Sequence, residues 1–226
     1  MAEIGIIIVT YNSETEIGAS LDAALLTGAD VVVIDNGSHD RTIAEVARRG
    51  VRLIANPSNQ GFAAAVNQGF AVLDSRYVLL LNPDAVLESG LEPLREACDL
   101  PGSAGAGGQL LDAGGRPQIG FMVRQLPTPA ALILEVALLN RIWPGNPVNR
   151  RYRGLALDYS TRLAVEQPAG AFFMVRRAGV SGRCGGLLPA EHCGIDSRSE
   201  PEAFGSVRKS RGVREPLLVV RSGPGI

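Results

Sequence analysis

The amino-acid sequence predicts an α/β fold with a mostly parallel central sheet flanked by helices. Short, continuous hydrophobic segments lie at residues 4–9, 31–34, 51–55 and 77–81. Such segments are typical of strands that are buried on both faces of a parallel sheet. The intervals between them carry apolar residues at helical spacing, so we expect helical crossovers between successive strands. The two observations together favour alternating strands and helices at the start of the chain.

The helices of these intervals are expected at residues 14–26, 42–49 and 62–73. In the first, Ile17, Leu21 and Leu25 fall on one helical face, and Ser13 is the expected N-cap. The second is expected to end at Gly50, because glycine commonly closes a helix. Each helix is preceded by a polar loop, so the pattern is that of repeated strand, loop and helix units.

Polar side chains follow the carboxyl ends of the four strands, at Thr10, Asp35, Asn56 and Asp84. Right-handed crossovers place these ends along one edge of the sheet, where open α/β sheets bind their ligands. We therefore expect the four side chains to converge. The first loop contains neither a glycine-rich dinucleotide fingerprint nor a P-loop, which disfavours Rossmann cofactors and P-loop chemistry.

The fourth strand ends abruptly in Asn82, Pro83 and Asp84. Carboxylate and amide oxygens are ligands that Mg²⁺ and Mn²⁺ accept, together with the phosphate oxygens of a substrate. An ordinary turn is the alternative, because Asn-Pro and Pro-Asp pairs are common turn formers. The position at the ligand-binding edge of the sheet favours a metal site.

Length and composition indicate a globular chain without a nucleic-acid partner. The 226 residues are 46% hydrophobic and 20% charged, which fits one large domain or two small ones. A net charge of −1 offers no basic field for nucleic acid. The three cysteines show no paired spacing, and no targeting signal is visible at the start, so we expect a cytoplasmic location.

A proline-containing connection at residues 114–166 holds one further expected helix, at residues 129–140, with Thr128 as its cap. This helix is apolar nearly all round and is followed by Arg141 and Trp143. About a dozen residues cannot span a bilayer. The alternatives are a core helix, a flap over an acceptor site, or a helix that rests at a membrane interface.

Five short motifs occur in order along the chain: VTYNS at residues 9–13, VIDNGS at 33–38, residues 56–69 with Asn67 and Gly69, LLNPD at 80–84, and PAGAFFMVRR at 168–177. Together they resemble family 2 glycosyltransferases of the GT-A fold, and most of all the bacterial rhamnosyltransferase-like members. The resemblance implies a Rossmann-like nucleotide-diphospho-sugar transferase domain at residues 1–177. Its nucleotide-binding half would comprise residues 1–112, and the connection and acceptor-side part residues 113–177. Residues 178–226 depart from the family pattern and form a divergent tail, for which poor order is one alternative.

The resemblance also implies an activity. The expected reaction is the inverting, metal-assisted transfer of a sugar, rhamnose among the candidates, from a dTDP- or UDP-linked donor. The acceptor would be a cell-envelope glycan or a polyprenyl-linked lipid, with peripheral attachment at the inner face of the cell membrane. The implied cofactor is Mg²⁺ or Mn²⁺. The implied residues are Asp84 and Asn82 for the metal, Thr10, Tyr11, Asn12, Asp35 and Asn67 for the donor nucleotide, and Gly170 and Ala171 for the acceptor side.

Several of these residues keep a structural alternative. Tyr11 could cap the sheet edge, and Asp35 could belong to a turn that starts a helix. Asn67 could bond backbone groups around its helix.

Inverting transfer needs a general base, usually an acidic residue. Family members carry Gly-Gly-Phe-Asp and then a Glu-Asp pair after the strand near residue 172. Here the pair is absent, and Glu191 and Asp196 are the remaining candidates. A change of reading frame, or divergence, after Arg177 would explain the loss. An inactive donor-binding remnant is therefore one alternative to an active enzyme. A nucleotidyltransferase is a second, although its expected glycine-rich first loop with Lys or Arg is absent.

Overall fold

A computed structural model gives the structure of the chain and describes residues 2–112, 114–125, 128–143, 145–159, 161, 163–165, 167–168, 170, 172–180 and 213–221. The strands are β1 (Ile4–Thr10), β2 (Asp30–Asp35), β3 (Arg52–Ala55), β4 (Tyr77–Leu81), β5 (Ser103–Leu110), β6 (Val123–Arg124), β7 (Leu163–Val165), β8 (Gln167–Pro168), β9 (Phe172–Arg176) and β10 (Val213–Arg221). The helices are α1 (Ile17–Leu25), α2 (Thr42–Ala47), α3 (Phe62–Val72), α4 (Glu92–Cys98), α5 (Pro129–Val136), α6 (Leu139–Ile142), α7 (Pro147–Tyr152) and α8 (Arg177–Val180).

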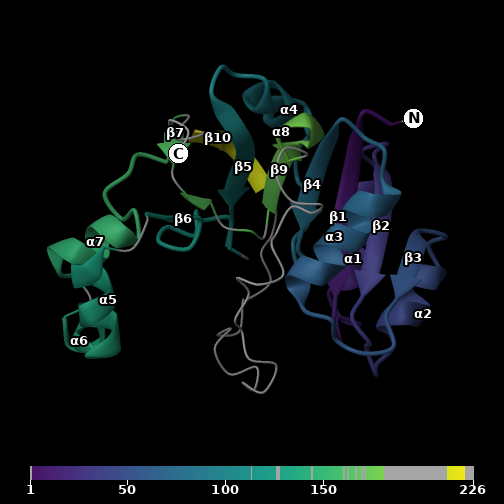
Figure 1. Ribbon diagram of the computed structural model, residues 1–226, viewed down its shortest axis with the longest axis horizontal. Helices are drawn as coiled ribbons and strands as arrows, with labels where there is room; N and C mark the ends of the chain where they lie inside the picture. The colour runs from purple at the N-terminus through teal and green to yellow at the C-terminus, as the bar shows by residue number, and fades with distance from the viewer. Residues whose placement is uncertain are drawn as a thin grey trace.

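The described strands form one large sheet and one small one (Figure 1). The large sheet has eight strands in the order β3-β2-β1-β4-β9-β5-β10-β7, and β6 pairs with β8. Strands β1 to β4 are parallel to one another, whereas β9 and β5 are antiparallel to their neighbours. Four of the seven pairings described in the large sheet are parallel, so the prediction of a mostly parallel sheet is confirmed.

Side chains from the parallel strands alternate between two cores, one on each face of the sheet. Ile6 and Ile8 pack with α1, α2 and α4 on one face, whereas Ile7 packs with α3 on the other. Strand β4 is buried along its whole length. Burial on both faces explains why the strands read as continuous hydrophobic runs without polar alternation.

The predicted strands and helices of residues 4–81 are all present, with ends that differ by a few residues. The largest difference is at α1, which begins at Ile17, so the prediction of Ser13 as its N-cap is wrong. The N-cap is Glu16, and Ser13 lies in the preceding turn. The amide of Ser13 donates to Thr42 Oγ1 at 2.7 Å, and its hydroxyl donates to the carbonyl of Tyr11. Ser13 therefore contacts the first residue of α2 and its own loop instead of capping α1.

The helix expected at residues 129–140 is divided into α5 and α6. The helix is interrupted at Leu138, which has a positive φ of 55°. The predicted cap is confirmed, because the amide of Ala131 donates to Thr128 Oγ1 at 3.2 Å. The alternative of a core helix is wrong: Ile133, Val136 and Ile142 are exposed, although Ala131 is buried.

Gly69 allows α3 to lie close against β1. A Cβ atom at this position would lie 2.8 Å from side-chain carbons of Ile7, which is itself buried. Gly69→Ala is expected to lower the free energy of unfolding by about 1–2 kcal/mol, because overpacking outweighs the gain in helix propensity. Urea denaturation followed by circular dichroism measures this change.

A matched control for Gly69 is Gly18 on α1. A Cβ there would meet only the end of the flexible Arg49 side chain, at 2.9 Å. Gly18→Ala should therefore be neutral or stabilising by about 0.5 kcal/mol. Equal effects of the two substitutions would show that the approach of α3 to Ile7 is not tightly packed.

Candidate active site

Asp35, at the end of β2, organises the carboxyl edge of the parallel strands. Its Oδ1 accepts from Thr10 Oγ1 at 2.9 Å and from Ser38 Oγ at 2.5 Å. Its Oδ2 accepts from the amides of Gly37 and Ser38 at 3.1 and 2.9 Å. Asp35 and Thr10 are fully buried. Four donors therefore occupy the carboxylate, which fixes the ends of β1 and β2 to each other.

Glycine is required at position 37. Its φ is +80°, and a Cβ there would lie 3.0 Å from the Cα of Ser58. Only glycine adopts this backbone conformation readily, and it leaves room for the loop after β3. The sequence Asp-Asn-Gly-Ser is therefore a turn, as its residue types predict, and the turn lies at the sheet edge.

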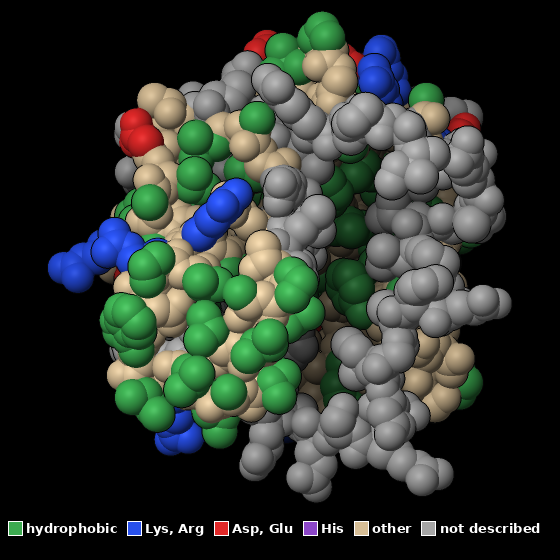
Figure 2. Space-filling model, turned by 60° about the vertical axis from the view of Figure 1, so that its left-hand side comes forward, with side chains coloured by type: hydrophobic (Ala, Val, Ile, Leu, Met, Phe, Trp, Pro, Cys, Tyr) green, Lys and Arg blue, Asp and Glu red, His purple; other side chains and the backbone are tan. Residues whose placement is uncertain are grey.

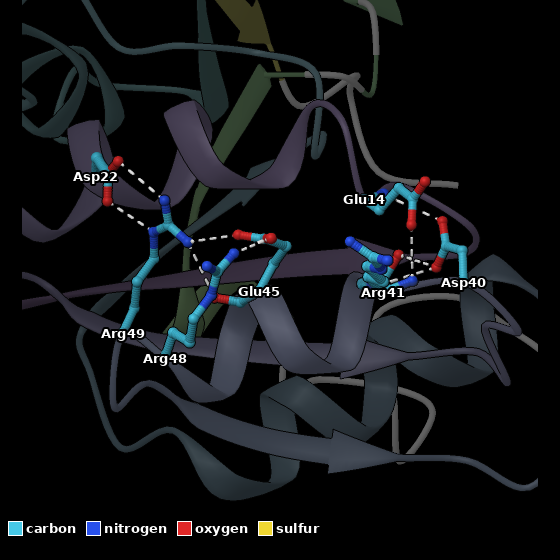
Figure 3. Close-up of polar contacts among 8 residues, drawn as sticks. Glu14, Asp22, Asp40, Arg41, Glu45, Arg48 and Arg49 are labelled. Carbon is cyan, nitrogen blue, oxygen red and sulfur yellow. Dashed lines mark hydrogen bonds and ion pairs between the residues drawn. The ribbon is translucent and has the colours of Figure 1, made fainter.

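The loops after β1 and β2 are joined by a ladder of hydrogen bonds. The amide of Asn12 donates to Ser38 Oγ at 2.8 Å, and the amide of His39 donates to Asn12 Oδ1 at 2.9 Å. Further along, the amide of Glu14 donates to Asp40 Oδ2, and the amide of Arg41 donates to Glu14 Oε2 (Figure 3). The two loops therefore form one braced unit.

Asp40 is the anionic centre of this unit. Burial raises its pKa, but hydrogen bonds from the hydroxyl and amide of Thr42 and from the amide of Glu14 outweigh burial and hold the pKa below its ordinary value. At neutral pH its carboxylate is consequently ionised and accepts all of these bonds.

Helices α1 and α2, which follow the two loops, are tied by Arg49. Its guanidinium donates to Asp22 of α1 at 2.7 and 3.1 Å and to Glu45 of α2 (Figure 3). The bond from Arg49 lowers the pKa of Asp22. This clamp ties α1 to α2 at a distance from the two loops (Figure 3).

An amide network extends the braced edge to β3 and α3. Asn36 Nδ2 donates to the carbonyl of Gly61, and Asn56 Nδ2 donates to Asn36 Oδ1 at 3.1 Å. Asn56 and Gln68 exchange hydrogen bonds of 3.0 Å in both directions. Sequence reasoning placed Asn56 at this edge but missed Asn36 and Gln68; the signal was the run of amides at the ends of β2 and β3.

The turn after β4 lies next to the first turn of α1. Ser20 of α1 donates its hydroxyl to the carbonyl of Asn82 at 3.4 Å, and the amide of Ala85 donates to the same carbonyl at 3.1 Å. Asp84 is half-buried in this turn. Burial raises its pKa, and the nearby charge of Glu16 raises it further. The region around Asp84 therefore favours positive charge.

Strand β9 brings Gly170, which the family resemblance implies for the acceptor side, to the same edge. Because β9 is antiparallel to β4 and Phe172 pairs with Leu81, the chain just before β9 lies beside the turn of Asn82 and Asp84. Gly170 is exposed there. Ala171, and the candidate bases Glu191 and Asp196, lie outside the described residues.

Of the residues predicted to bind the donor, Tyr11 and Asn12 are exposed, whereas Thr10 and Asp35 are buried beneath them. The Tyr11 side chain is 48% exposed and offers a ring face at the edge of the sheet. Asn12 has a φ of 49°, a conformation that asparagine adopts more readily than most residues. Asn67 is half-buried on α3, five residues beyond its first residue.

Asp84 and Asn82 fit a divalent cation that is shared with a substrate. One carboxylate and one amide are a small set of metal ligands. Oxygens of a diphosphate and of water would complete the set, as they commonly do for Mg²⁺. Within the described part of the chain, three or more acidic, cysteine or histidine side chains do not gather into a protein-only metal cage. The arrangement therefore fits a metal that binds with its substrate.

One known protein family matches most of the chain. The sequence model described as glycosyl transferase family 2 matches residues 5–177, which is most of the chain. This chain belongs to glycosyltransferase family 2. The match begins in β1 and extends through β9, so it includes every loop of the braced edge.

Three solved structures show the extent of the similarity. S. aureus TarS 1–349 is 23% identical, with 55% of this chain and 41% of that chain covered and a TM-score of 0.44. A mannosyltransferase from Pyrobaculum calidifontis is 17% identical, with 99% and 57% covered and a TM-score of 0.50. Glucosyl-3-phosphoglycerate synthase from Mycobacterium tuberculosis is 17% identical, with 78% and 56% covered and a TM-score of 0.43.

The chain thus spans less than two-thirds of the length of each of these structures. No curated protein matches the sequence. The family match, and the similarity in fold to the mannosyltransferase, confirm the GT-A fold that the motifs implied.

Proposed function

We propose that this family 2 member transfers a sugar from a nucleotide-diphosphate donor to a cell-envelope acceptor. The observation that carries the proposal is the convergence of the braced loops after β1 and β2 with Asp84, across the ends of three neighbouring parallel strands. A nucleoside would lie on the first two loops, against the exposed ring of Tyr11. Its diphosphate would extend toward Asp84, since β1 separates β2 from β4.

Asp84 and Asn82 are the proposed ligands of Mg²⁺ or Mn²⁺. When bound, the metal would neutralise charge on the leaving diphosphate without a proton donor. The protein's part is to hold the diphosphate in place. Burial and the charge of Glu16 raise the pKa of Asp84, and a bound cation would favour its ionised form. Asp35 would support the nucleoside by fixing the loops, or would accept directly from base or ribose after exchange of one of its present donors.

The donor is proposed to be dTDP- or UDP-linked, with rhamnose among the sugars. The P. calidifontis mannosyltransferase was solved with GDP-Man and Mn²⁺, so a guanine donor belongs in the same test. Asn67 is proposed to lie near the donor pyrophosphate or sugar, and Gly170 and Ala171 on the acceptor side.

The acceptor is proposed to be a glycan or a polyprenyl-linked lipid at the inner face of the cell membrane, in the cytoplasm. Among the described residues, no helix is both long and apolar enough to cross a bilayer. Attachment at the surface of the membrane would bring the chain to such an acceptor.

Inverting transfer also requires a base for the acceptor hydroxyl, and Glu191 or Asp196 is the proposed group. The missing Glu-Asp pair favours a second candidate function, an inactive protein that binds the donor without transferring it. Divergence of residues 178–226 would be its cause. The family match counts against a nucleotidyltransferase.

Calorimetry with UDP, dTDP and GDP, each with and without Mn²⁺, tests the proposal. We expect one nucleotide to bind at least about tenfold more tightly with Mn²⁺, because Asp84 and Asn82 would hold a cation that offsets the charge of the diphosphate. Hydrolysis of the matching nucleotide sugar then separates the active enzyme from the inactive binder. Absence of metal-dependent nucleotide binding would overturn both.

A further inference from the structure

An exposed apolar face covers α5 and α6, on the opposite side of the molecule from β1 to β3 (Figure 1). Its members are large hydrophobic side chains between 43% and 85% exposed: Leu132, Ile133, Val136, Leu138, Leu139, Ile142 and Trp143. We call this set the α5–α6 face. In α5 these residues follow one another at spacings of one and three, opposite the buried Ala131, so they form one side of the helix.

Positive charge surrounds the α5–α6 face. Residues 128–153 contain four arginines, Arg141, Arg150, Arg151 and Arg153, against one acidic residue, Glu135, in a chain whose net charge is −1. Arg141, Arg150 and Arg151 are exposed. In Figure 2 the hydrophobic side chains gather on the side that bears α5 to α7, with Lys and Arg side chains at its borders.

The arginines also border a hollow beside the face. Arg150, Arg151 and Trp143 line a pocket of about 540 Å³ together with Gln125 and Gly145. Arg151 Nε donates to Gln125 Oε1 at 3.2 Å, which holds one guanidinium at the rim. Guanidinium groups of this kind match phosphate oxygens.

We propose that the α5–α6 face docks on the surface of an anionic phospholipid bilayer. The apolar side chains would enter the boundary between headgroups and acyl chains, and the arginines would contact lipid phosphates. Trp143 lies between the two zones, which is the position that Trp favours at membrane interfaces. Charge complementarity favours this occupant over an apolar protein partner. The inference extends the membrane part of the proposed function but needs neither donor nor acceptor.

Vesicle flotation and the fluorescence of Trp143, the single tryptophan of the chain, test the proposal directly. The full chain is mixed with vesicles of phosphatidylcholine alone or with one-third phosphatidylglycerol. We expect flotation and a blue shift of Trp143 emission with the anionic vesicles, and weakening by salt. Equal flotation with both vesicles would overturn the role of charge, and absence of flotation would overturn the docking surface.

Variants separate the two contributions. Ile133→Asp with Val136→Asp should lower the partition coefficient by at least tenfold, because two of the apolar side chains become charged. Arg141→Gln with Arg150→Gln should lower it about fivefold for each arginine removed, and only with anionic vesicles. Circular dichroism verifies that each variant folds.

The matched control is Leu26, just after α1, which is 90% exposed and lies outside the α5–α6 face. Leu26→Asp should leave flotation unchanged, and an equal loss would show that binding is nonspecific.

Sedimentation in the absence of lipid adds one more outcome: a dimer that Val136→Asp dissociates would assign the face to a second copy of the chain and overturn the proposal. Nucleotide binding is measured separately, so failure of either proposal leaves the other interpretable.

Discussion

Asp84→Ala is expected to lower donor turnover by about 10²–10³-fold, the cost of removing one preorganised electrostatic group from a transition state. The same substitution should abolish the dependence of nucleotide binding on Mn²⁺. The physical reason is that Asp84 is the one carboxylate in the turn after β4, beside the start of β9. Steady-state hydrolysis of the donor and calorimetry with UDP and Mn²⁺ measure the two effects.

The control is Asp74→Ala, which changes an exposed carboxylate near the opposite end of β4. It should leave both quantities within a factor of about two, since exposed surface charges contribute little. If Asp84→Ala kept Mn²⁺-dependent binding, the metal would have to lie elsewhere and the assignment of the turn would be wrong.

The raised pKa of Asp84 adds a pH dependence to this result. Metal binding needs the ionised carboxylate, so affinity for Mn²⁺ should fall as the pH decreases through a pKa above that of an ordinary aspartate. Glu16→Gln removes one negative neighbour and should move this fall to lower pH. A titration of Mn²⁺ affinity against pH for both proteins measures the displacement.

The raised pKa of Asp84 also makes the stability of the metal-free protein depend on pH, with higher stability at low pH. A carboxyl group with a raised pKa in the folded state adds its full contribution to the free energy of unfolding below its unfolded pKa. That contribution is lost as the pH rises through the folded pKa. At neutral pH, Asp84 therefore costs stability in the metal-free protein. The isosteric Asp84→Asn should slightly raise the melting temperature while it removes the metal dependence.

Asp35→Ala is expected to lower the free energy of unfolding by about 3 kcal/mol. The substitution leaves the amides of Gly37 and Ser38 and the hydroxyl of Thr10 without their acceptor in a fully buried position. Because these bonds join the ends of β1 and β2, nucleotide affinity should decrease as well. Urea unfolding gives the stability, and calorimetry with the best-binding nucleotide gives the affinity.

Asp30→Asn at the start of the same strand is the matched control. Asp30 forms only a partly exposed ion pair with Arg52, at 3.7 Å. Its replacement should cost less than about 1 kcal/mol and leave nucleotide affinity unchanged. Similar losses from the two substitutions would indicate that stability and nucleotide affinity depend on the charge of β2 and not on the hydrogen bonds at its carboxyl end.

The fold of residues 4–81 was predictable because each strand there is buried on both faces and each helix has one apolar side. The run from Tyr77 to Leu81 is an example, with every side chain buried. Strand β5 was not predicted: its sequence is rich in glycine and alanine, which carry little strand signal. Small residues are required there, since a Cβ at Gly105 would lie 2.6 Å from the carbonyl oxygen of Met174.

The site was predictable in its location and less so in its details. Strand ends supplied Thr10, Asp35, Asn56 and Asp84, because topology alone brings such ends together. The sequence could not show that four hydrogen-bond donors from three residues already occupy the carboxylate of Asp35. Nor could it show the nearness of Glu16 to Asp84, which depends on where α1 begins and how it lies against β4.

The insertion of β9 between β4 and β5 makes the two halves of the domain interdependent during folding. Strand β9 covers an edge of β4, and the next residue, Arg177, closes the end of α3 by donating to the carbonyls of Phe70, Leu73 and Ser75. A nascent chain that had not yet reached residue 172 would expose β4 as an open, apolar strand edge. Residues 1–112 are therefore expected to aggregate when they are made without β9, which completes the sheet beside β4.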